Sequence, residues 1–527
     1  MRSFFVVLCG LAAPATAFAI PIGDVCRGSP PACTMPDGCS GQKLCDEGVW
    51  TGCDYAYTRQ SYRSCTECGL GAKQACGVGP TFYGPCTAAC TTASGQPGEV
   101  TSCTATGAPI CQLPYRQRFP FPSTTPGLGN SLGVNLHTDQ VSDAELDLLR
   151  DAGVRFVRLD TSVNDYLADP QGYWSGRWGS FLDRLDARGL RAIMILGGFA
   201  VGPPFASTGY AQFSQYARDG ATALKERGIL WEVWNEPNLR KFWNGLDPSS
   251  SDYALLAANV NLAIKLATPD EWIIGPALGH NGEAYLDDLL GRGYILGYWD
   301  GITIHPYEVS EGPAAPYCSP APEWLTAPAY LLSFAPYISC GAVLQQYRSV
   351  VAAHIAAGQK TPPILVGEWG YNTARTSQQP EYAAREWLTG YVGGVPLTVY
   401  YHWKDLPQDT ARYGLADPQG VPTRSYWALR FVVTRLSSAT YLDSPSAYPR
   451  VPVQYHFRSA ASQEVYVAYG DSPGNATISV YPGTYRIETL DLSTNPPVVQ
   501  SRLQSTGTTL TLWLTAMPTI LTRVSIF

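Results

Sequence analysis

Two glutamates, Glu236 and Glu368, each follow a short apolar run and lie beside tryptophans, in Trp-Asn-Glu-Pro and Gly-Glu-Trp-Gly. The apolar runs, Leu230–Trp234 and Ile364–Val366, are typical of buried strands, so each glutamate marks the point where a strand ends. Two carboxyl groups can divide acid–base and nucleophilic work at a glycosidic bond, and flat rings beside them can stack on sugars. The spacing therefore predicts a pair of reactive carboxyl groups at one end of a parallel sheet.

The two motifs resemble those of the clan A retaining glycoside hydrolases. The longer run Trp-Asn-Glu-Pro-Asn-Leu-Arg-Lys-Phe-Trp, from Trp234 to Trp243, is most similar to glycoside hydrolase family 39 and its exopolysaccharide-hydrolase relatives. The resemblance covers roughly residues 130–527. It implies a retaining O-glycosidase that needs no cofactor or metal, with Glu236 as acid/base and Glu368 as nucleophile. The structural alternative is two glutamates that only cap strand ends.

The resemblance also implies supporting residues. Arg158, at a strand end, would hold the nucleophile ionised, because a nearby positive charge lowers a carboxylate's pKa. The alternative is a buried pair with Glu232, and one arginine can do both. His305 and Tyr307 end another strand, where a tyrosine near the nucleophile and a histidine near the acid are expected. A core histidine is the ordinary alternative for His305.

Aromatic and amide side chains are expected to hold the sugar. By resemblance, Asn235 grips the 2-hydroxyl and Trp403 forms the platform under the central subsite. Trp174, Trp178 and Trp243 follow strands on the same face and are candidates for further subsites, with core packing as the equal alternative.

The segment from Glu308 to Cys340 is too long for a routine connection and is rich in aromatic residues. It is a candidate wall or lid of the cleft, which a Cys318–Cys340 disulfide could close, or else a cover for the rim.

Short apolar runs alternate with amphipathic stretches between residues 130 and 438, which predicts βα units. The expected helices include Asp143–Asp151, Phe181–Arg188, Tyr210–Arg227 and Ser425–Leu436. The eight expected strands are Leu132–Leu136, Val154–Leu159, Ala192–Leu196, Leu230–Trp234, Trp272–Gly275, Gly301–Ile304, Ile364–Val366 and Leu397–Tyr401. Eight units favour a (β/α)8 TIM barrel over an open dinucleotide-binding sheet, because no Gly-x-Gly-x-x-Gly follows the first strand.

The barrel is expected to be one part of a multidomain chain. Residues 1–19 are typical of a secretory signal peptide, which predicts a secreted protein. Residues 20–111 form a Cys-rich repeat region, 112–129 a Pro-rich linker, 130–438 the barrel and 439–527 an antiparallel β-sandwich. The sandwich is expected to be structural in preference to carbohydrate-binding. The Cys-rich region is either a module for cell-surface or glycan attachment or a protease-resistant spacer.

Cysteine usage supports export. Of fifteen cysteines, twelve lie between Cys26 and Cys111, which predicts small disulfide-stapled units. Cys65-x-x-Cys68 could instead begin a zinc site, although no histidine occurs in this region.

The formal net charge of −7 argues against nucleic acid or an acidic membrane as partner, and no later stretch is apolar enough to span a bilayer. Aromatic residues make up 12% and charged residues only 15%, a balance that suits a neutral glycan.

Three functions compete. The first is a secreted retaining glycosidase acting on a polysaccharide or oligosaccharide. The second is an inactive glycan-binding surface protein or adhesin on the same scaffold, which the intact Glu236 and Glu368 disfavour. The third is a metal-dependent hydrolase using His137, His305 and His402, which lacks a His-x-His pair on the first strand.

Overall fold

The chain divides into two compact units, residues 1–113 and 114–527. The computed structural model describes residues 32–34, 40–46, 49–54, 61–65, 72–76, 89–103, 109–122, 131–198, 207–243, 245–279, 282–292, 299–306, 338–355, 361–373, 377–409, 412–446, 452–470 and 472–525.

The second unit contains a closed barrel of eight parallel strands, in which each strand pairs with its neighbours in chain order and the last pairs with the first. The strands are β9 Ser131–Asn135, β10 Val154–Ser162, β11 Arg191–Gly197, β12 Leu230–Val233, β13 Trp272–Leu278, β14 Gly301–Ile304, β15 Ile364–Trp369 and β16 Leu397–Tyr400. All eight predicted strands are confirmed, and so is the TIM barrel. Their β-branched and leucine-rich runs are buried on both faces, as a parallel sheet covered by helices requires.

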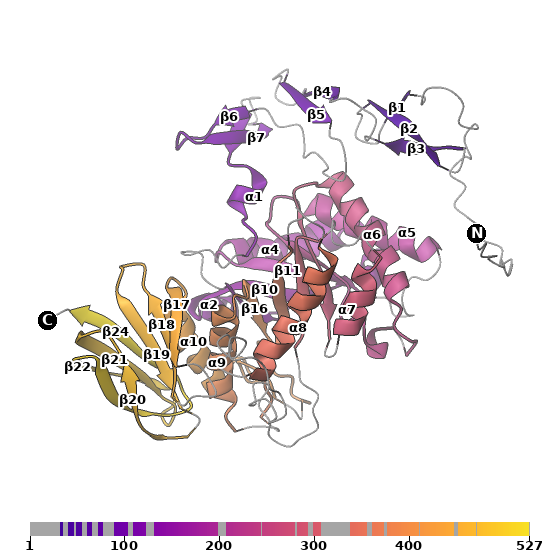
Figure 1. Cartoon of the computed structure of the whole chain (residues 1–527). Helices are drawn as coiled ribbons and strands as arrows, with labels where there is room; N and C mark the ends of the chain where they lie inside the picture. The colour runs from indigo at the N-terminus through magenta and orange to yellow at the C-terminus, as the bar shows by residue number, and fades with distance from the viewer. Residues whose placement is uncertain are drawn as a thin grey trace, which may run out of the picture. The chain divides into compact units, whose positions relative to one another are not determined.

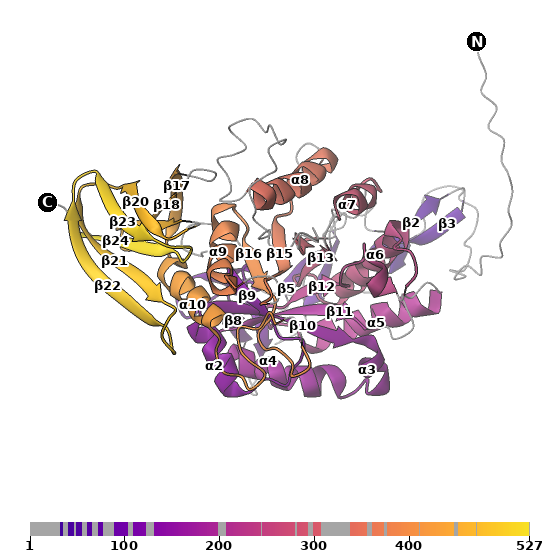
Figure 2. The ribbon, with the colours of Figure 1, turned by 90° about the horizontal axis from the view of Figure 1, so that it is seen from below.

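Helices surround the barrel, with α9 and α10 on one side and α5 and α6 on the other (Figure 2). They are α2 Asp143–Asp151, α3 Val163–Ala168, η3 Tyr173–Trp178, α4 Gly179–Asp186, α5 Ser207–Ala223, η4 Arg240–Trp243, α6 Ser250–Ala267, α7 Glu283–Leu290, α8 Ile338–His354, α9 Gln379–Val392 and α10 Arg424–Leu436. Helix α2 begins where predicted because Ser142 and Glu145 form a reciprocal capping box.

Aromatic residues before the first barrel strand close the N-terminal end of the barrel. Helix α1 (Tyr115–Arg118) places Tyr115 in an apolar cluster with Phe156 and Trp272, and Phe119 and Phe121 pack against the same cluster. The prediction of a semi-extended linker over 112–129 does not hold for residues 115–118, which form a helix, and residues 123–129 lie outside the described part of the chain. Burying the aromatic side chains of this stretch against the open end of the barrel contributes more stabilising free energy than the preference of its prolines for an extended backbone.

The described residues of the first unit form three small antiparallel sheets: β1–β2–β3, β4–β5 and β6–β7–β8. The strands are β1 Ala32–Thr34, β2 Ser40–Asp46, β3 Val49–Asp54, β4 Ser61–Cys65, β5 Ala72–Cys76, β6 Ala89–Thr91, β7 Pro97–Cys103 and β8 Pro109–Gln112. The cysteine side chains here, and those of Cys318 and Cys340, lie outside the described part of the chain. Disulfide pairing and the Cys65-x-x-Cys68 alternative therefore stay predictions, as does the signal peptide.

The antiparallel C-terminal domain is also confirmed, and it packs beside α9 and α10 (Figure 1). A six-stranded sheet runs β17–β18–β19–β24–β21–β22, and β20 pairs with β23. The strands are β17 Thr440–Ser446, β18 Val453–Arg458, β19 Glu464–Tyr469, β20 Gly474–Ser479, β21 Gly483–Asp491, β22 Val498–Thr506, β23 Thr509–Leu514 and β24 Thr519–Ser525. Tyr466, Tyr485, Ile487, Leu510 and Leu512 belong to one buried apolar cluster that joins the two sheets.

Buried polar contacts fasten this domain to the barrel. Arg385 of α9 donates to the carbonyl oxygens of Ala516 (2.7 Å) and Gly470 (3.0 Å), and Arg435 of α10 pairs with Glu488 at 2.9 Å. Among the described residues, no helix has the length and apolar character needed to cross a membrane.

One carboxyl group is buried near the closed end of the barrel. Glu271 accepts hydrogen bonds from the Tyr115 hydroxyl and the Trp231 indole, both at 3.0 Å. Burial raises the pKa of Glu271 to about 7, and the two hydrogen bonds only partly offset that effect. Folded Glu271 therefore keeps its proton until about pH 7, whereas the unfolded chain releases it near its ordinary value of 4.5.

This difference predicts a pH-dependent stability. The stabilisation is complete below the unfolded pKa and is lost as the pH rises through about 7, by about 3 kcal/mol in total. Glu271→Gln keeps an oxygen acceptor and removes the titration. We expect urea unfolding at about pH 5 and about pH 8 to show a smaller fall in unfolding free energy for the variant than for the wild type. Equal falls in both proteins would contradict the assignment.

Candidate active site

The barrel brings Glu236 and Glu368 together at the C-terminal ends of β12 and β15. An oxygen of each carboxyl group and a ring nitrogen of His305 all lie within 4.8 Å of one another. Both glutamate side chains are 12% exposed, so they are accessible but largely shielded from water. Two carboxyl groups at this distance can act on the same bond from opposite sides.

Local backbone geometry turns the chain at Glu236 away from the line of β12 and toward β13. Trp234 and Glu236 both have positive φ angles (68° and 43°), and the Glu236 amide donates to the Ala277 carbonyl of β13 at 2.9 Å. These conformations are uncommon for residues other than glycine, and they redirect the chain directly after β12. The Trp243 indole donates to the Pro237 carbonyl and holds the far side of the same turn.

Arg158 on β10 connects most of the site, although it is only 1% exposed. Its Nη1 donates to Glu368 Oε1 at 2.6 Å and to Asn135 Oδ1 at 3.1 Å. Its Nε donates to Glu232 Oε2 at 2.5 Å, and its Nη2 to Asn235 Oδ1 at 2.7 Å. Arg158 thus contacts Glu368 and also forms the alternative buried pair with Glu232.

Electrostatics keep this arginine charged. Burial by itself would lower the pKa of Arg158, but the carboxylates Glu232, Glu368 and Asp160 more than offset it and raise that pKa above its ordinary value. The Arg158 guanidinium is therefore a fixed cation that is hydrogen-bonded directly to Glu368.

His305 follows β14 and is completely buried. Burial lowers the pKa of His305 to about 4, so the imidazole is neutral at ordinary pH. Its Nε2 lies 3.4 Å from Arg158 Nη2, and because a guanidinium only donates, Nε2 must accept. The ring proton is therefore on Nδ1, which donates to Glu236 Oε1 at 3.0 Å. The prediction placed a histidine near the acid, and His305 lies there.

Asn235 precedes Glu236 and is oriented by Arg158. Its carbonyl oxygen accepts from the guanidinium, which leaves the amide NH2 directed elsewhere. Asn235 also lines a pocket of about 480 Å³ at the ends of β10 and β11, together with His137, Asp160, Gly198 and Phe242. The amide can therefore donate to a ligand held in this pocket.

Trp403 is not a sugar platform, and that prediction is wrong. The side chain is 1% exposed, its indole donates to Glu145 at 3.1 Å, and its ring packs against Tyr426. Trp403 thus connects the loop after β16 to the start of helix α2. A ring enclosed in this way has no face open to a sugar.

Three further tryptophans were candidate subsites, and the structure corrects these as well. Trp174, Trp178 and Trp243 are all buried in the main apolar core. Trp174 donates to the Tyr216 carbonyl at 3.1 Å and stacks on the Tyr216 ring. The packing alternative holds for all three, because their large apolar area is best buried between the helices.

Tyr401 is a residue of the site that sequence reasoning missed. It directly follows β16, its side chain is partly exposed, and its ring lies edge-on to His137 at 5.0 Å. Burial raises the pKa of Tyr401 above its ordinary value, and the charge of Glu368 adds to the rise. The signal was available, because Tyr401 ends the predicted strand Leu397–Tyr401 at the face where the site residues lie.

Part of the predicted site lies outside the described residues. These are Tyr307 and residues 308–337, which cover most of the candidate lid. Their proposed contacts with the cleft stay predictions.

The histidines of the metal hypothesis do not form one group of ligands. His137 packs against His402 at 5.4 Å between ring centroids, whereas His305 contacts the two glutamates. Glu236, His305 and Glu368 are close enough to hold a cation, but the Arg158 guanidinium already binds Glu368. A fixed positive charge on that carboxylate opposes a divalent ion.

The comparisons with solved structures agree with the fold. A family 39 glycoside hydrolase from Bacteroides cellulosilyticus WH2 has a TM-score of 0.60 at 18% identity, and the match covers 93% of each chain. A monomeric beta-xylosidase from Caulobacter crescentus CB15 has a TM-score of 0.53 at 17% identity, over 76% of this chain and 96% of the other.

A family 30 endoxylanase from Clostridium papyrosolvens C71 has a TM-score of 0.52 at 14% identity, over 76% of this chain and 97% of that one. No protein-family model matches the chain, and no curated protein matches it. At these identities, the likeness establishes that the chain has the fold of clan A glycoside hydrolases.

The pairing of Arg158 with Glu232 predicts a two-step stability test. Arg158→Met leaves the buried Glu232 carboxylate without a counter-charge, which should lower the unfolding free energy by about 3–5 kcal/mol. Adding Glu232→Gln removes that charge and should restore part of the lost unfolding free energy. Urea unfolding of the single and double variants measures both effects. A double variant no more stable than Arg158→Met would show that Glu232 is not the residue left unpaired.

Proposed function

We propose that this protein is a retaining glycoside hydrolase that cleaves a polysaccharide or oligosaccharide by double displacement. The observation that carries the proposal is the approach of Glu236 and Glu368 to within 4.8 Å, oxygen to oxygen. Retaining enzymes hold their carboxyl groups about 5–5.5 Å apart, whereas inverting enzymes need about 6.5–9.5 Å to admit a water. The short separation supports direct attack by one carboxylate.

Glu368 is the nucleophile in this mechanism. Its hydrogen bond from Arg158 holds the carboxyl group in place for attack on the anomeric carbon. The carbon–oxygen bond to the leaving group breaks as the bond to Glu368 forms, which gives a covalent glycosyl-enzyme. Water then attacks the same carbon and releases the sugar with its original configuration.

Glu236 is the acid and then the base. It gives its proton to the leaving oxygen in the first step and takes a proton from the attacking water in the second. The Nδ1–H of neutral His305 donates to Glu236 Oε1 and fixes the orientation of the carboxyl group. Because His305 remains neutral above about pH 4, it adds no charge that would hold Glu236 ionised in the first step.

Asn235 and Tyr401 hold the sugar in this proposal. The Asn235 amide faces a ligand because Arg158 occupies its carbonyl oxygen, so it is placed to donate to the 2-hydroxyl. Tyr401 takes the platform role that the sequence suggested for Trp403, since its ring is partly open and close to Glu368. Tyr307 remains the proposed hydrogen-bond donor to the nucleophile.

Beta-linked xylan and xylosides are the first substrates to test, because a beta-xylosidase and an endoxylanase are among the structural neighbours. We also propose secretion through residues 1–19, and attachment to a cell surface or glycan through residues 20–111. The competing function is a glycan-binding adhesin without activity. The joint placement of Glu236, Glu368, Arg158 and Asn235 favours catalysis over that alternative.

Chemical rescue tests the assignment. Glu368→Ala removes the nucleophile, so turnover of an aryl glycoside should fall by about 10⁴-fold or more, while Asn235 and the pocket still bind glycan. Sodium azide should restore part of the rate, because the small anion fits the space left by the carboxylate. The product should be a glycosyl azide of inverted configuration, identified by proton NMR.

The matched control is Glu236→Ala. This variant keeps the nucleophile, so azide should instead intercept the glycosyl-enzyme and give an azide of retained configuration. Full activity in Glu368→Ala would contradict the mechanism, and glycan binding without turnover by the wild type would favour the adhesin.

A further inference from the structure

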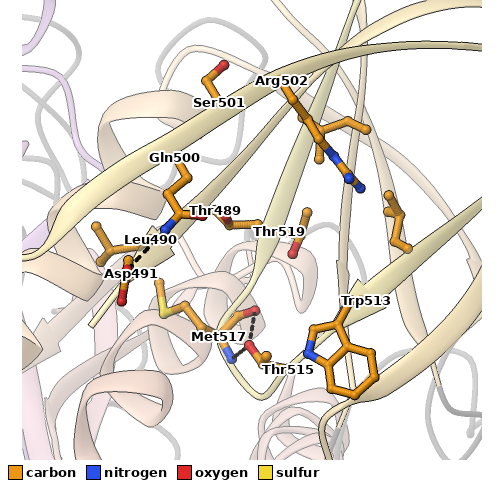
Figure 3. Close-up of a pocket in the computed structure, with 12 residues that line it drawn as sticks. Thr489, Leu490, Asp491, Gln500, Ser501, Arg502, Trp513, Thr515, Met517 and Thr519 are labelled. Atoms are coloured by element: carbon orange, nitrogen blue, oxygen red, sulfur yellow. Dashed lines mark hydrogen bonds between the residues drawn. The ribbon is translucent and has the colours of Figure 1, made fainter. Parts of the chain in front are cut away.

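The C-terminal domain contains a pocket of about 400 Å³ that the proposed reaction does not use. It lies among strands β21, β22 and β23 and the loop that leads into β24 (Figure 3). Its volume falls within the range of about 300–1,000 Å³ that is typical of ligand pockets. We propose that this pocket binds a neutral saccharide chain, with one sugar ring stacked on Trp513.

Trp513 offers the aromatic face that such a site needs. Its side chain is 60% exposed, although tryptophan is among the most buried residues on average. It lies on β23 and lines the pocket, and it forms no ring contact with any other described aromatic residue. The six tryptophans Trp178, Trp231, Trp243, Trp369, Trp387 and Trp403, by contrast, are fully buried in the barrel. An indole left in water at a hollow surface can cover the apolar face of a pyranose ring.

Polar side chains stand opposite this ring. Asp491 Oδ2 accepts from Gln500 Nε2 at 3.0 Å, and Asp491 Oδ1 accepts from the Ser493 amide at 2.9 Å. Figure 3 shows this Asp491–Gln500 pair across the pocket from Trp513 and Arg502. A carboxylate fixed in this way, beside a carboxamide, can accept and donate hydrogen bonds to neighbouring hydroxyl groups.

The charge of the pocket points to a neutral ligand. Among the described residues that line it, only Asp491 and Arg502 carry charge, and their charges cancel. Arg502 forms no ion pair with any residue in the described part of the chain, so its guanidinium is available to a ligand oxygen. A nucleic acid or a phosphate would require a clear excess of positive charge. A saccharide requires an apolar face and several hydroxyl partners, and the pocket offers both.

The floor of the pocket is held rigidly. Leu512 and Met517 are buried beneath it, and the Met517 amide donates to Thr515 Oγ1 at 3.2 Å. The carbonyl oxygen of Ala516, which lies between Thr515 and Met517 in the chain, accepts a 2.7 Å hydrogen bond from the buried Arg385 of barrel helix α9. The loop is therefore fixed before any ligand arrives, which reduces the entropic cost of binding. This site does not require the barrel to be catalytic.

Native gel electrophoresis with a soluble polysaccharide in the gel tests the site. The full chain with Glu368→Ala is run against xylan, mixed-linkage β-glucan and galactan as neutral probes and against polygalacturonate as an acidic probe. A neutral polysaccharide should retard the protein, and adding Trp513→Ala should weaken the apparent affinity about tenfold. Adding Tyr481→Ala is the matched control, because Tyr481 is an exposed aromatic (52%) of the same domain outside the pocket.

The outcomes are distinct. The proposal is overturned if the Trp513→Ala protein binds the polysaccharide within about twofold of its parent's affinity and has the same thermal midpoint. It is also overturned if only polygalacturonate retards the protein, or if no glycan does. With Glu368 intact, Trp513→Ala should hydrolyse a small aryl glycoside at the wild-type rate. Failure of the glycosidase proposal would appear as inactivity of the wild type and would leave the gel result valid.

Discussion

The candidate site depends on one buried cation. Arg158 is almost inaccessible to water, and such a charge is tolerated only when carboxylates and hydrogen-bond acceptors replace its hydration. Here Glu232 and Glu368 supply the charge, and Asn135 and Asn235 supply neutral acceptors. The same guanidinium fixes the ring tautomer of His305, which donates to Glu236, so a single side chain connects the two reactive glutamates. The placement of the two reactive carboxyl groups therefore depends on the charge network around Arg158.

The barrel makes this network possible because parallel strands all end at one face. Residues separated by more than 200 positions, such as Arg158 and Glu368, become hydrogen-bond partners without any long-range loop. The turn after β12 also depends on positive φ angles at Trp234 and Glu236, which redirect the chain directly after that strand. At the opposite end, Tyr115 and the buried Glu271 belong to the layer that closes the barrel. The candidate site and the layer that closes the barrel thus lie at opposite ends of the same sheet.

Elements with a strong local signal could be predicted from the sequence. Eight apolar runs identified eight strands, and Glu236 and Glu368 were recognised because each follows such a run and lies beside tryptophans. The predicted sugar-binding roles of the tryptophans were wrong because a residue type does not reveal which face of a helix, strand or loop the side chain occupies. Trp403 lies two residues beyond Tyr401, yet its indole donates to buried Glu145, whereas the Tyr401 ring contacts His137, which lines the pocket. Helix α1 was missed because its value lies in covering the barrel end, a tertiary effect that its prolines conceal.

The stereochemistry of the first product tests the central claim most directly. Wild-type protein is mixed with a β-linked aryl glycoside, and the anomeric proton of the released sugar is followed by NMR before mutarotation. Attack by Glu368 followed by water must deliver the β-anomer first, because two inversions restore the starting configuration. The α-anomer as first product would contradict the account, since it would mean that water attacks directly and that the close approach of Glu236 and Glu368 serves another purpose.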